Sequence, residues 1–214
     1  MAAQVYVLEG AWEKTHEAPQ VLPYLLAYAH SHRTVDVYHR TFRRIEDIEY
    51  YVKRVPTGSR ALFYFACHGE EEFLIPSDGR SKIPIGAVEG ALRGAKEGSI
   101  AFIHFGCCHF VHGGDRRKQT LSGLRDPAQA KWVSGYTRKV DWLASTLLDL
   151  ALISEVYVPW YSDQKWLSSK TRAFFKHYEQ LARSLGSSTL STQLLHVARN
   201  RHPGEGRGPV LLTN

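Results

Sequence analysis

The segment Ala61–Gly69 reads ALFYFACHG, a continuous apolar and aromatic run that ends in Cys-His-Gly. A second run, Ser99–Cys108, reads SIAFIHFGCC and ends in a small residue followed by two cysteines. Short apolar runs without polar alternation are typical of strands that are buried on both faces of a parallel sheet. We therefore expect two central strands, each with reactive side chains at its carboxyl end.

Segments with helical and strand-like periodicity alternate on both sides of these two runs. Further strands are expected at Val5–Glu9, Thr34–His39, Lys131–Tyr136 and Glu155–Trp160. Helices are expected at Pro19–His30, Ile45–Val55, Ile83–Arg93, Val140–Ile153, Lys165–Leu185 and Thr189–Arg199. The segment Gln119–Lys131 fits either a long loop or a broken helix. This order predicts an α/β protein of three layers, α/β/α, in which helices cover both faces of a mostly parallel central sheet.

The composition is that of a globular protein with one hydrophobic core. Of the 214 residues, 43% are hydrophobic and 22% are charged. We expect a single domain over residues 1–200 and a flexible, Gly- and Pro-rich tail over residues 201–214. No run approaches the roughly 18 consecutive apolar residues of a membrane span, and no signal-like segment opens the sequence, so we expect neither a membrane partner nor secretion.

The cysteines and the net charge indicate the cellular compartment and the kinds of binding partner to expect. Three cysteines, two of them adjacent, form no disulfide framework and favour free thiols in a reducing, cytoplasmic compartment. The formal net charge is +6. Because the basic residues are scattered and belong to no DNA- or RNA-reading module, nucleic acid is not expected as a specific partner.

The candidate site follows from the two strand ends. Ligand and catalytic sites of open α/β sheets form beyond the carboxyl ends of the strands. A sharp turn after each of the two runs would direct the imidazole of His68 and the thiol of Cys107 or Cys108 into one crevice. A thiol needs a nearby base or cation to become a nucleophilic thiolate near neutral pH, and His68 could supply it.

Zinc binding is an alternative interpretation of this region, and two other residues in it are expected to be structural. Cys107, Cys108, His109 and His112 are residue types that bind zinc, although adjacent cysteines reach one tetrahedral ion poorly. Cys67 and His104 lie inside their strands and are expected to be core residues.

The pair of strand ends resembles the caspase-like cysteine peptidases, which include caspases, metacaspases, legumain-like and CHAT-like proteins. In these proteins one apolar strand ends in His-Gly and a later one ends in a small residue followed by Cys. The segments that look like small, standalone prokaryotic members are Tyr6–Trp12 (YVLEGAW), Cys67–Gly69 (CHG), Phe105–Cys108 (FGCC) and Ser134–Trp142 (SGYTRKVDW). The Gln-Ala-Cys-x-Gly signature of animal caspases is absent, so their substrate specificity is not carried over.

The resemblance implies a cysteine endopeptidase with a His-Cys dyad. It assigns the histidine to His68 and the nucleophile to Cys108, with Cys107 as the alternative, and the backbone N–H groups of Gly69 and of the cysteine as the oxyanion donors. It implies no metal and no organic cofactor, a protein substrate, an upstream activating protein, and a prokaryotic role in stress or antiviral defence. The competing hypothesis is a catalytically silent caspase-like module that takes part in protein interaction or nucleotide-responsive signalling.

Two expectations concern the surroundings of the dyad. Asp141 and Glu70, the latter within the acidic run Glu70–Glu72, would make the mouth of the crevice acidic and select Arg or Lys in the substrate. Alternatively, Asp141 stabilises the first turn of the following helix, and Arg138 and Lys139 reverse the sign of the pocket. The segment Gly113–Lys118 is expected to be an accessible, protease-sensitive loop.

Overall fold

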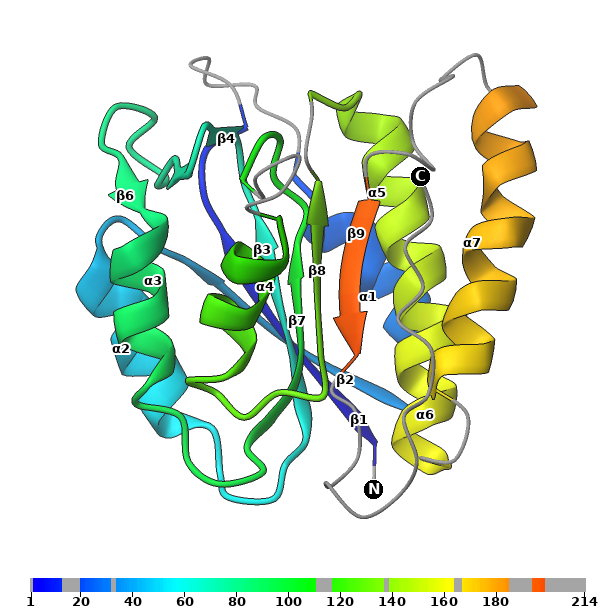
Figure 1. Cartoon of the computed structure of the whole chain (residues 1–214), viewed down its shortest axis with the longest axis horizontal. Helices are drawn as coiled ribbons and strands as arrows, with labels where there is room; N and C mark the ends of the chain where they lie inside the picture. Colours follow the sequence, from blue (N-terminus) through cyan, green and yellow to red (C-terminus); the bar gives the residue numbers. More distant parts are fainter. Residues whose placement is uncertain are drawn as a thin grey trace.

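A six-stranded sheet runs through the middle of the molecule, with the strands in the order β2-β1-β3-β7-β8-β9 (Figure 1). The computed structural model describes residues 2–12, 20–31, 34–110, 117–136, 139–163, 167–184 and 194–198. The strands are β1 (Ala3–Glu9), β2 (Val35–Thr41), β3 (Ala61–Ala66), β7 (Ile100–Phe105), β8 (Trp132–Tyr136) and β9 (Leu194–Ala198). The first five pair in parallel, and β9 pairs with β8 in the antiparallel direction.

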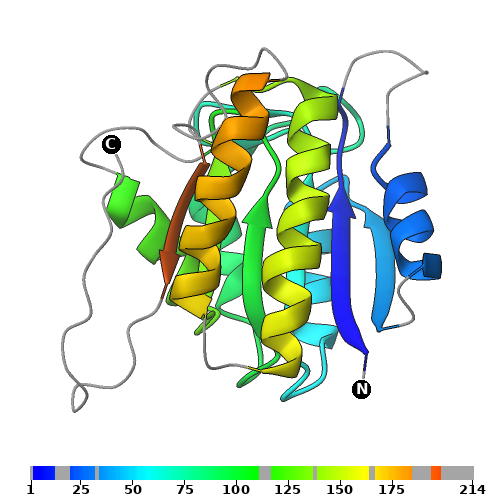
Figure 2. The same cartoon turned by 90° about the vertical axis from the view of Figure 1, so that its right-hand side faces the viewer.

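Helices cover both faces of this sheet, so the expected α/β/α layering is confirmed (Figures 1 and 2). One face carries α2 (Ile45–Arg54), α3 (Ile85–Leu92) and α4 (Arg117–Arg125). The other face carries α1 (Leu22–Ser31), α5 (Trp142–Leu152), the π-helical turn η2 (Ile153–Tyr157), α6 (Val158–Ser162) and α7 (Leu167–Ser184). A separate hydrophobic cluster lies on each side of the sheet, which is why β3 and β7 are buried at every position.

The topology determines where a site can form. The chain passes from β1 to the edge strand β2 and then returns to β3 on the other side of β1. Crevices of open α/β sheets form near such a reversal, beyond the carboxyl ends of the strands. Directly after β3, a small antiparallel sheet follows, made of β4 (Gly69–Glu70), β5 (Phe73–Leu74) and β6 (Ile83–Pro84). The sequence analysis did not predict this small sheet.

Two predicted segments differ from the structure, and the sequence leaves a third open. Glu155–Trp160 is not a strand, because it continues α5 through η2 into α6. Val156, Tyr157 and Trp160 favour a strand by propensity, but burial of this face on the sheet decides the conformation. Within Thr189–Arg199, expected as a helix, the described residues form β9, which pairs with the free edge of β8. Of the two alternatives for Gln119–Lys131, the helical one holds as far as Arg125, in α4.

One described helical segment, Trp142–Ser162, is long and apolar enough to cross a membrane by length and composition alone, with a mean hydropathy of 1.2. Polar residues such as Asp149 and Glu155 interrupt it, so it contains no continuous apolar run of that length. Of its most apolar window, 44% is buried inside the protein. Leu148, Leu152 and Ile153 belong to the hydrophobic cluster on the sheet, so packing in the core accounts for much of this apolar character. The expected tail, residues 201–214, lies outside the described residues.

We predict that the protein loses stability at alkaline pH. Burial raises the pKa of the Cys107 thiol and of the Tyr64 and Tyr136 hydroxyls well above their ordinary values. Above the ordinary thiol pKa of about 8.5, the unfolded chain therefore releases protons that the folded chain retains, and the free energy of unfolding falls as the pH rises. The loss should steepen near about pH 10, where tyrosines ionise in the unfolded chain.

Urea unfolding followed by tryptophan fluorescence measures this dependence. The Tyr64→Phe variant should show a shallower fall near about pH 10, because it removes one of the hydroxyls that ionises only on unfolding. A free energy of unfolding that stays constant through this range would contradict the prediction.

Candidate active site

The pairing of β3 with β7 brings the two strand ends to the same level. Phe65 lies opposite Phe105 in the parallel register, and the Gly106 N–H donates to the Phe65 carbonyl at 2.9 Å. His68 and Cys108 each follow three residues after a member of this pair. The two side chains that the sequence singled out therefore leave neighbouring strands at equivalent positions.

Backbone contacts hold the turn that carries His68. Its N–H donates to the Ala11 carbonyl at 2.6 Å, and its carbonyl accepts from the Ile75 N–H at 3.0 Å. The next residue, Gly69, lies directly against the second strand end. A Cβ at this position would come within 2.1 Å of the Cys108 carbonyl oxygen and 2.9 Å of the Cys107 Cβ. The His-Gly step thus lets the two turns approach closely, which no larger residue would allow.

A pocket of about 440 Å³ opens between these turns. It is lined by His68, Gly69, Glu70, Glu71, Phe73, Lys82, Cys108, His109 and Lys139. His68 and Gly69 follow β3, Cys108 follows β7, and Lys139 follows β8, so the pocket lies beyond the carboxyl ends of three adjacent strands. This is the place that the sequence analysis expected.

Cys108 is largely buried and contacts the backbone at the start of α5. Its Sγ accepts from the Val140 N–H at 3.3 Å and lies 3.7 Å from the Val140 carbonyl oxygen. Burial raises the pKa of the Cys108 thiol above its ordinary value, while the Val140 N–H and the Lys139 ammonium act in the opposite direction. The thiol is therefore protonated at neutral pH, and attack on a substrate would require a base.

Cys107 points away from the pocket into the core. It is 0% exposed, and its Sγ lies 3.4 Å from the Sγ of Cys67, which is also 0% exposed. Burial raises the pKa of the Cys107 thiol well above its ordinary value. All three cysteines are free thiols. Of the two nucleophile candidates, the structure thus brings only Cys108 into the pocket with His68.

The expected acidic mouth is not formed by Asp141. Asp141 is the N-cap of α5, where its Oδ1 accepts from the Ala144 N–H at 2.9 Å, and it does not line the pocket. Glu70 does line the pocket, but it forms an ion pair with Lys82. Lys139 adds a second cation beside Cys108. The described lining of the pocket therefore contains both acidic and basic side chains. This agrees with the alternative from the sequence in which Lys139 offsets the acidic residues.

Sequence reasoning missed three lining residues. Phe73 and Lys82 belong to the hairpin that follows His68, and short strands of two residues leave no periodic signal. His109 appeared only as a possible metal ligand, whereas in the structure it is an exposed lining residue with φ of 51°. A non-glycine residue in the left-handed region is strained, and such strain is concentrated at functional sites.

Of the four residues in the zinc interpretation, His112 lies outside the described residues. Of the expected protease-sensitive loop Gly113–Lys118, residues 113–116 also lie outside them, and Arg117 and Lys118 begin α4. Within the part of the chain that the structure describes, no group of three or more His, Cys, Asp or Glu side chains is arranged to hold a metal ion.

Comparison with known structures identifies the fold. An X-ray structure of a secreted C11 cysteine protease from Bacteroides thetaiotaomicron, in complex with an irreversible peptide inhibitor, matches with a TM-score of 0.53 at 10% sequence identity. The match covers 92% of this chain and 66% of that chain, so this chain spans just under two thirds of the length of that protease. The shared architecture is a mostly parallel α/β sheet, and the chain has a caspase-like fold.

A crystal structure of a protein from Geobacter sulfurreducens matches more weakly, with a TM-score of 0.39 at 12% identity, covering 71% of this chain and 82% of that one. No protein-family model matches the sequence, and no curated protein matches it.

We predict that Gly69→Ala disrupts the site. Its methyl group would collide with the Cys108 carbonyl oxygen, which is backbone and cannot rotate away, so the two turns must separate. We expect a loss of roughly 1–3 kcal/mol in the free energy of unfolding, and slower alkylation of Cys108 by iodoacetamide. Gly86→Ala, on the exposed side of α3 with no atom within 4 Å of the new Cβ, is the matched control and should be neutral or stabilising. Equal behaviour of the two variants would contradict the prediction.

We also predict that Asp141 acts on stability rather than on substrate choice. Asp141→Ala removes the acceptor of the Ala144 N–H and should lower the free energy of unfolding by about 1 kcal/mol. In a panel of fluorogenic peptides that differ only in the residue before the cleaved bond, the order of preference should be the same for the variant and the wild type. A selective loss of cleavage after Arg or Lys would instead place Asp141 in the specificity pocket.

Proposed function

We propose that the protein is a cysteine endopeptidase that cleaves a protein substrate through a dyad of His68 and Cys108. The observation that carries the proposal is that His68 and Cys108 line the same pocket, beyond the carboxyl ends of β3 and β7. The caspase-like fold supports it, since the matched solved structure is a cysteine protease. A mixed-charge pocket open to solvent fits an extended peptide.

The geometry supports a general-base mechanism. Because burial raises the pKa of Cys108, His68 accepts the thiol proton as Sγ attacks the carbonyl carbon of the scissile amide. The backbone N–H groups of Gly69 and Cys108 are the proposed donors to the oxyanion. His68 then passes the proton to the leaving amine, and water hydrolyses the thioester that remains on Cys108. No step in this sequence uses a metal or an organic cofactor.

The biological setting is a further part of the proposal. We propose a standalone prokaryotic peptidase of the CHAT-like type that acts in the cytoplasm in stress or antiviral defence, under the control of an upstream activating protein. The segments around the two strand ends resemble that type, and three free cysteines fit a reducing compartment. The proposed partners include neither a membrane nor a specific nucleic acid.

We predict that Cys108→Ala and His68→Ala each abolish peptide cleavage without unfolding the protein. Loss of a covalent nucleophile removes several orders of magnitude in rate. An unbiased peptide-library digest supplies the substrate, and mass spectrometry measures alkylation at each cysteine. His68→Ala should slow alkylation of Cys108 and leave Cys67 and Cys107, which are fully buried, as unreactive as before.

Cys107→Ala is the matched control, because it removes the adjacent sulfur from the core instead of from the pocket. It should retain cleavage. An inactive Cys107→Ala beside an active Cys108→Ala would reverse the assignment of the nucleophile. Cleavage by both cysteine variants would contradict the proposed cysteine mechanism. No cleavage by the wild type, together with no dependence of Cys108 alkylation on His68, would favour the catalytically silent interaction module.

A further inference from the structure

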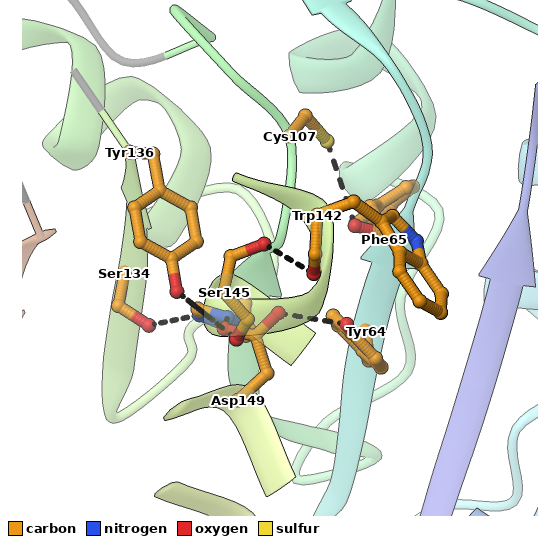
Figure 3. Close-up of polar contacts among 9 residues, drawn as sticks. Tyr64, Phe65, Cys107, Ser134, Tyr136, Trp142, Ser145 and Asp149 are labelled. Atoms are coloured by element: carbon orange, nitrogen blue, oxygen red, sulfur yellow. Dashed lines mark hydrogen bonds and ion pairs between the residues drawn. The ribbon is translucent and has the colours of Figure 1, made fainter. Parts of the chain in front are cut away.

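One buried carboxylate ties α5 to three strands of the sheet (Figure 3). Asp149 Oδ2 accepts from the Tyr64 hydroxyl of β3 at 2.7 Å. Its Oδ1 accepts from the Tyr136 hydroxyl of β8 at 2.7 Å and lies 2.7 Å from His104 Nε2 of β7. All four residues are at most 1% exposed.

The side chains of this cluster satisfy one another by hydrogen bonds. Both tyrosine hydroxyls donate to the Asp149 carboxyl group. His104 bridges this group to Ser134, with Nε2 on Asp149 Oδ1 and Nδ1 2.7 Å from Ser134 Oγ. A buried carboxylate is costly unless it is fully hydrogen-bonded, and apolar residues would fill the same space at a lower cost. The cluster therefore requires a reason beyond stability.

The three strands that Asp149 joins are those that carry the pocket. β3 leads to His68, β7 leads to Cys108, and β8 leads to Lys139. The carboxylate also touches the turn before the cysteines, since a Cβ at Gly106 would lie 2.7 Å from Asp149 Oδ2.

The same helix reaches the reactive sulfur at its other end. Val140, just before α5, donates its N–H to Cys108 Sγ at 3.3 Å. Asp149 lies about two and a half turns further along this helix. The position of α5 on the sheet therefore determines whether the Val140 N–H lies on the sulfur.

We propose that Asp149 is a positioning residue, which anchors α5 on β3, β7 and β8 and thereby holds the Val140 N–H on Cys108 Sγ. The inference rests on the proposed peptidase function, and it assigns Asp149 no contact with substrate. A donor on the sulfur stabilises the thiolate that forms during attack, and displacements of about 1 Å in such a site slow catalysis by about two orders of magnitude.

The test removes the donors one at a time, because Asp149→Ala would leave two hydroxyls and an imidazole buried without an acceptor. Tyr64→Phe releases β3 from the carboxylate, and Tyr136→Phe releases β8. Tyr157→Phe is the matched control. The Tyr157 hydroxyl is also buried, accepting from the Leu62 N–H at 3.1 Å and donating to the Gln4 carbonyl at 2.8 Å, but it lies at the amino end of β3.

The measurements are the pH profile of Cys108 alkylation, the kinetic constants on the best library peptide, and urea unfolding. Tyr136→Phe removes one ionisable group that interacts with Cys108, the Tyr136 hydroxyl. The other ionisable side chains around Cys108 are the same in all three variants: His68, Glu70, Glu71, Lys82, His109, Lys139, Cys67 and Cys107. In Tyr64→Phe and Tyr136→Phe the apparent pKa of Cys108 should rise by about one unit, with about tenfold slower alkylation below it. The value of kcat should fall while KM changes little. Tyr157→Phe should lose comparable stability with an unchanged Cys108 profile and kcat.

A purely structural role would affect all three variants in proportion to their loss of stability, and that result would overturn the inference. An unchanged Cys108 profile in Tyr64→Phe and Tyr136→Phe would overturn it as well. Failure of the proposed function is distinguishable, because the wild type would then cleave no library peptide and its Cys108 alkylation would not depend on His68. In that case the pH profiles of Cys108 alkylation would still show whether Tyr64→Phe and Tyr136→Phe change the apparent pKa of Cys108.

Discussion

The parallel pairing of β3 with β7 is the constraint on which the rest of the site depends. Both strands are buried on both faces, so a slip of one residue would exchange the side chains of two tightly packed clusters. With Phe65 fixed opposite Phe105, the chain has little choice about where His68 and Cys108 emerge. The sheet aligns the ends of β3 and β7, and the turns after these strands must then be tight enough to bring His68 and Cys108 together. Gly69 makes them tight, because its missing side chain leaves room for the Cys108 carbonyl.

The electrostatics of the pocket follow from this packing. The turn after β7 places two adjacent cysteines in opposite environments, with Cys107 in the core against Cys67 and Cys108 in the pocket. Burial disfavours the thiolate at both positions, and a backbone N–H opposes this effect at both, but only Cys108 has a lysine beside it. Sequence spacing left both cysteines open as the nucleophile, and their side-chain environments separate them. Because Cys107 and Cys108 are adjacent, sequence spacing cannot tell them apart. For the same reason one thiol lies in the core and the other in the pocket.

The sequence predicted the features that depend on local pattern. Fully apolar runs identified β3 and β7, and helical periodicity identified α2 and α3 to within two residues at each end. It failed where tertiary contacts decide the conformation, as in η2 and α6, whose strand-forming residues are helical because the sheet buries one side of them. The pocket walls were also missed in part, because Lys82 reaches the pocket through a hairpin too short to leave a pattern. Glu70 was predicted as a wall, but its ion pair with Lys82 was not, and this pairing changes the charge of the mouth.

The Asp149 cluster shows the limit of sequence reasoning most clearly. His104 was correctly placed in the core, yet its partner lies 45 positions away in another layer, and no spacing rule connects them. Asp149 is also one of two carboxyl groups, with Glu155, in a helical segment that otherwise has the length and hydropathy of a membrane span. In hydrocarbon a carboxylate at this place would be expensive. Here the three side chains that contact it, Tyr64, His104 and Tyr136, all come from the sheet. A shift of the helix along the sheet would break these contacts and leave the carboxyl group buried without them. Burial of the apolar residues thus drives this helix onto the sheet, and the carboxyl group fixes the position in which it packs on β3, β7 and β8.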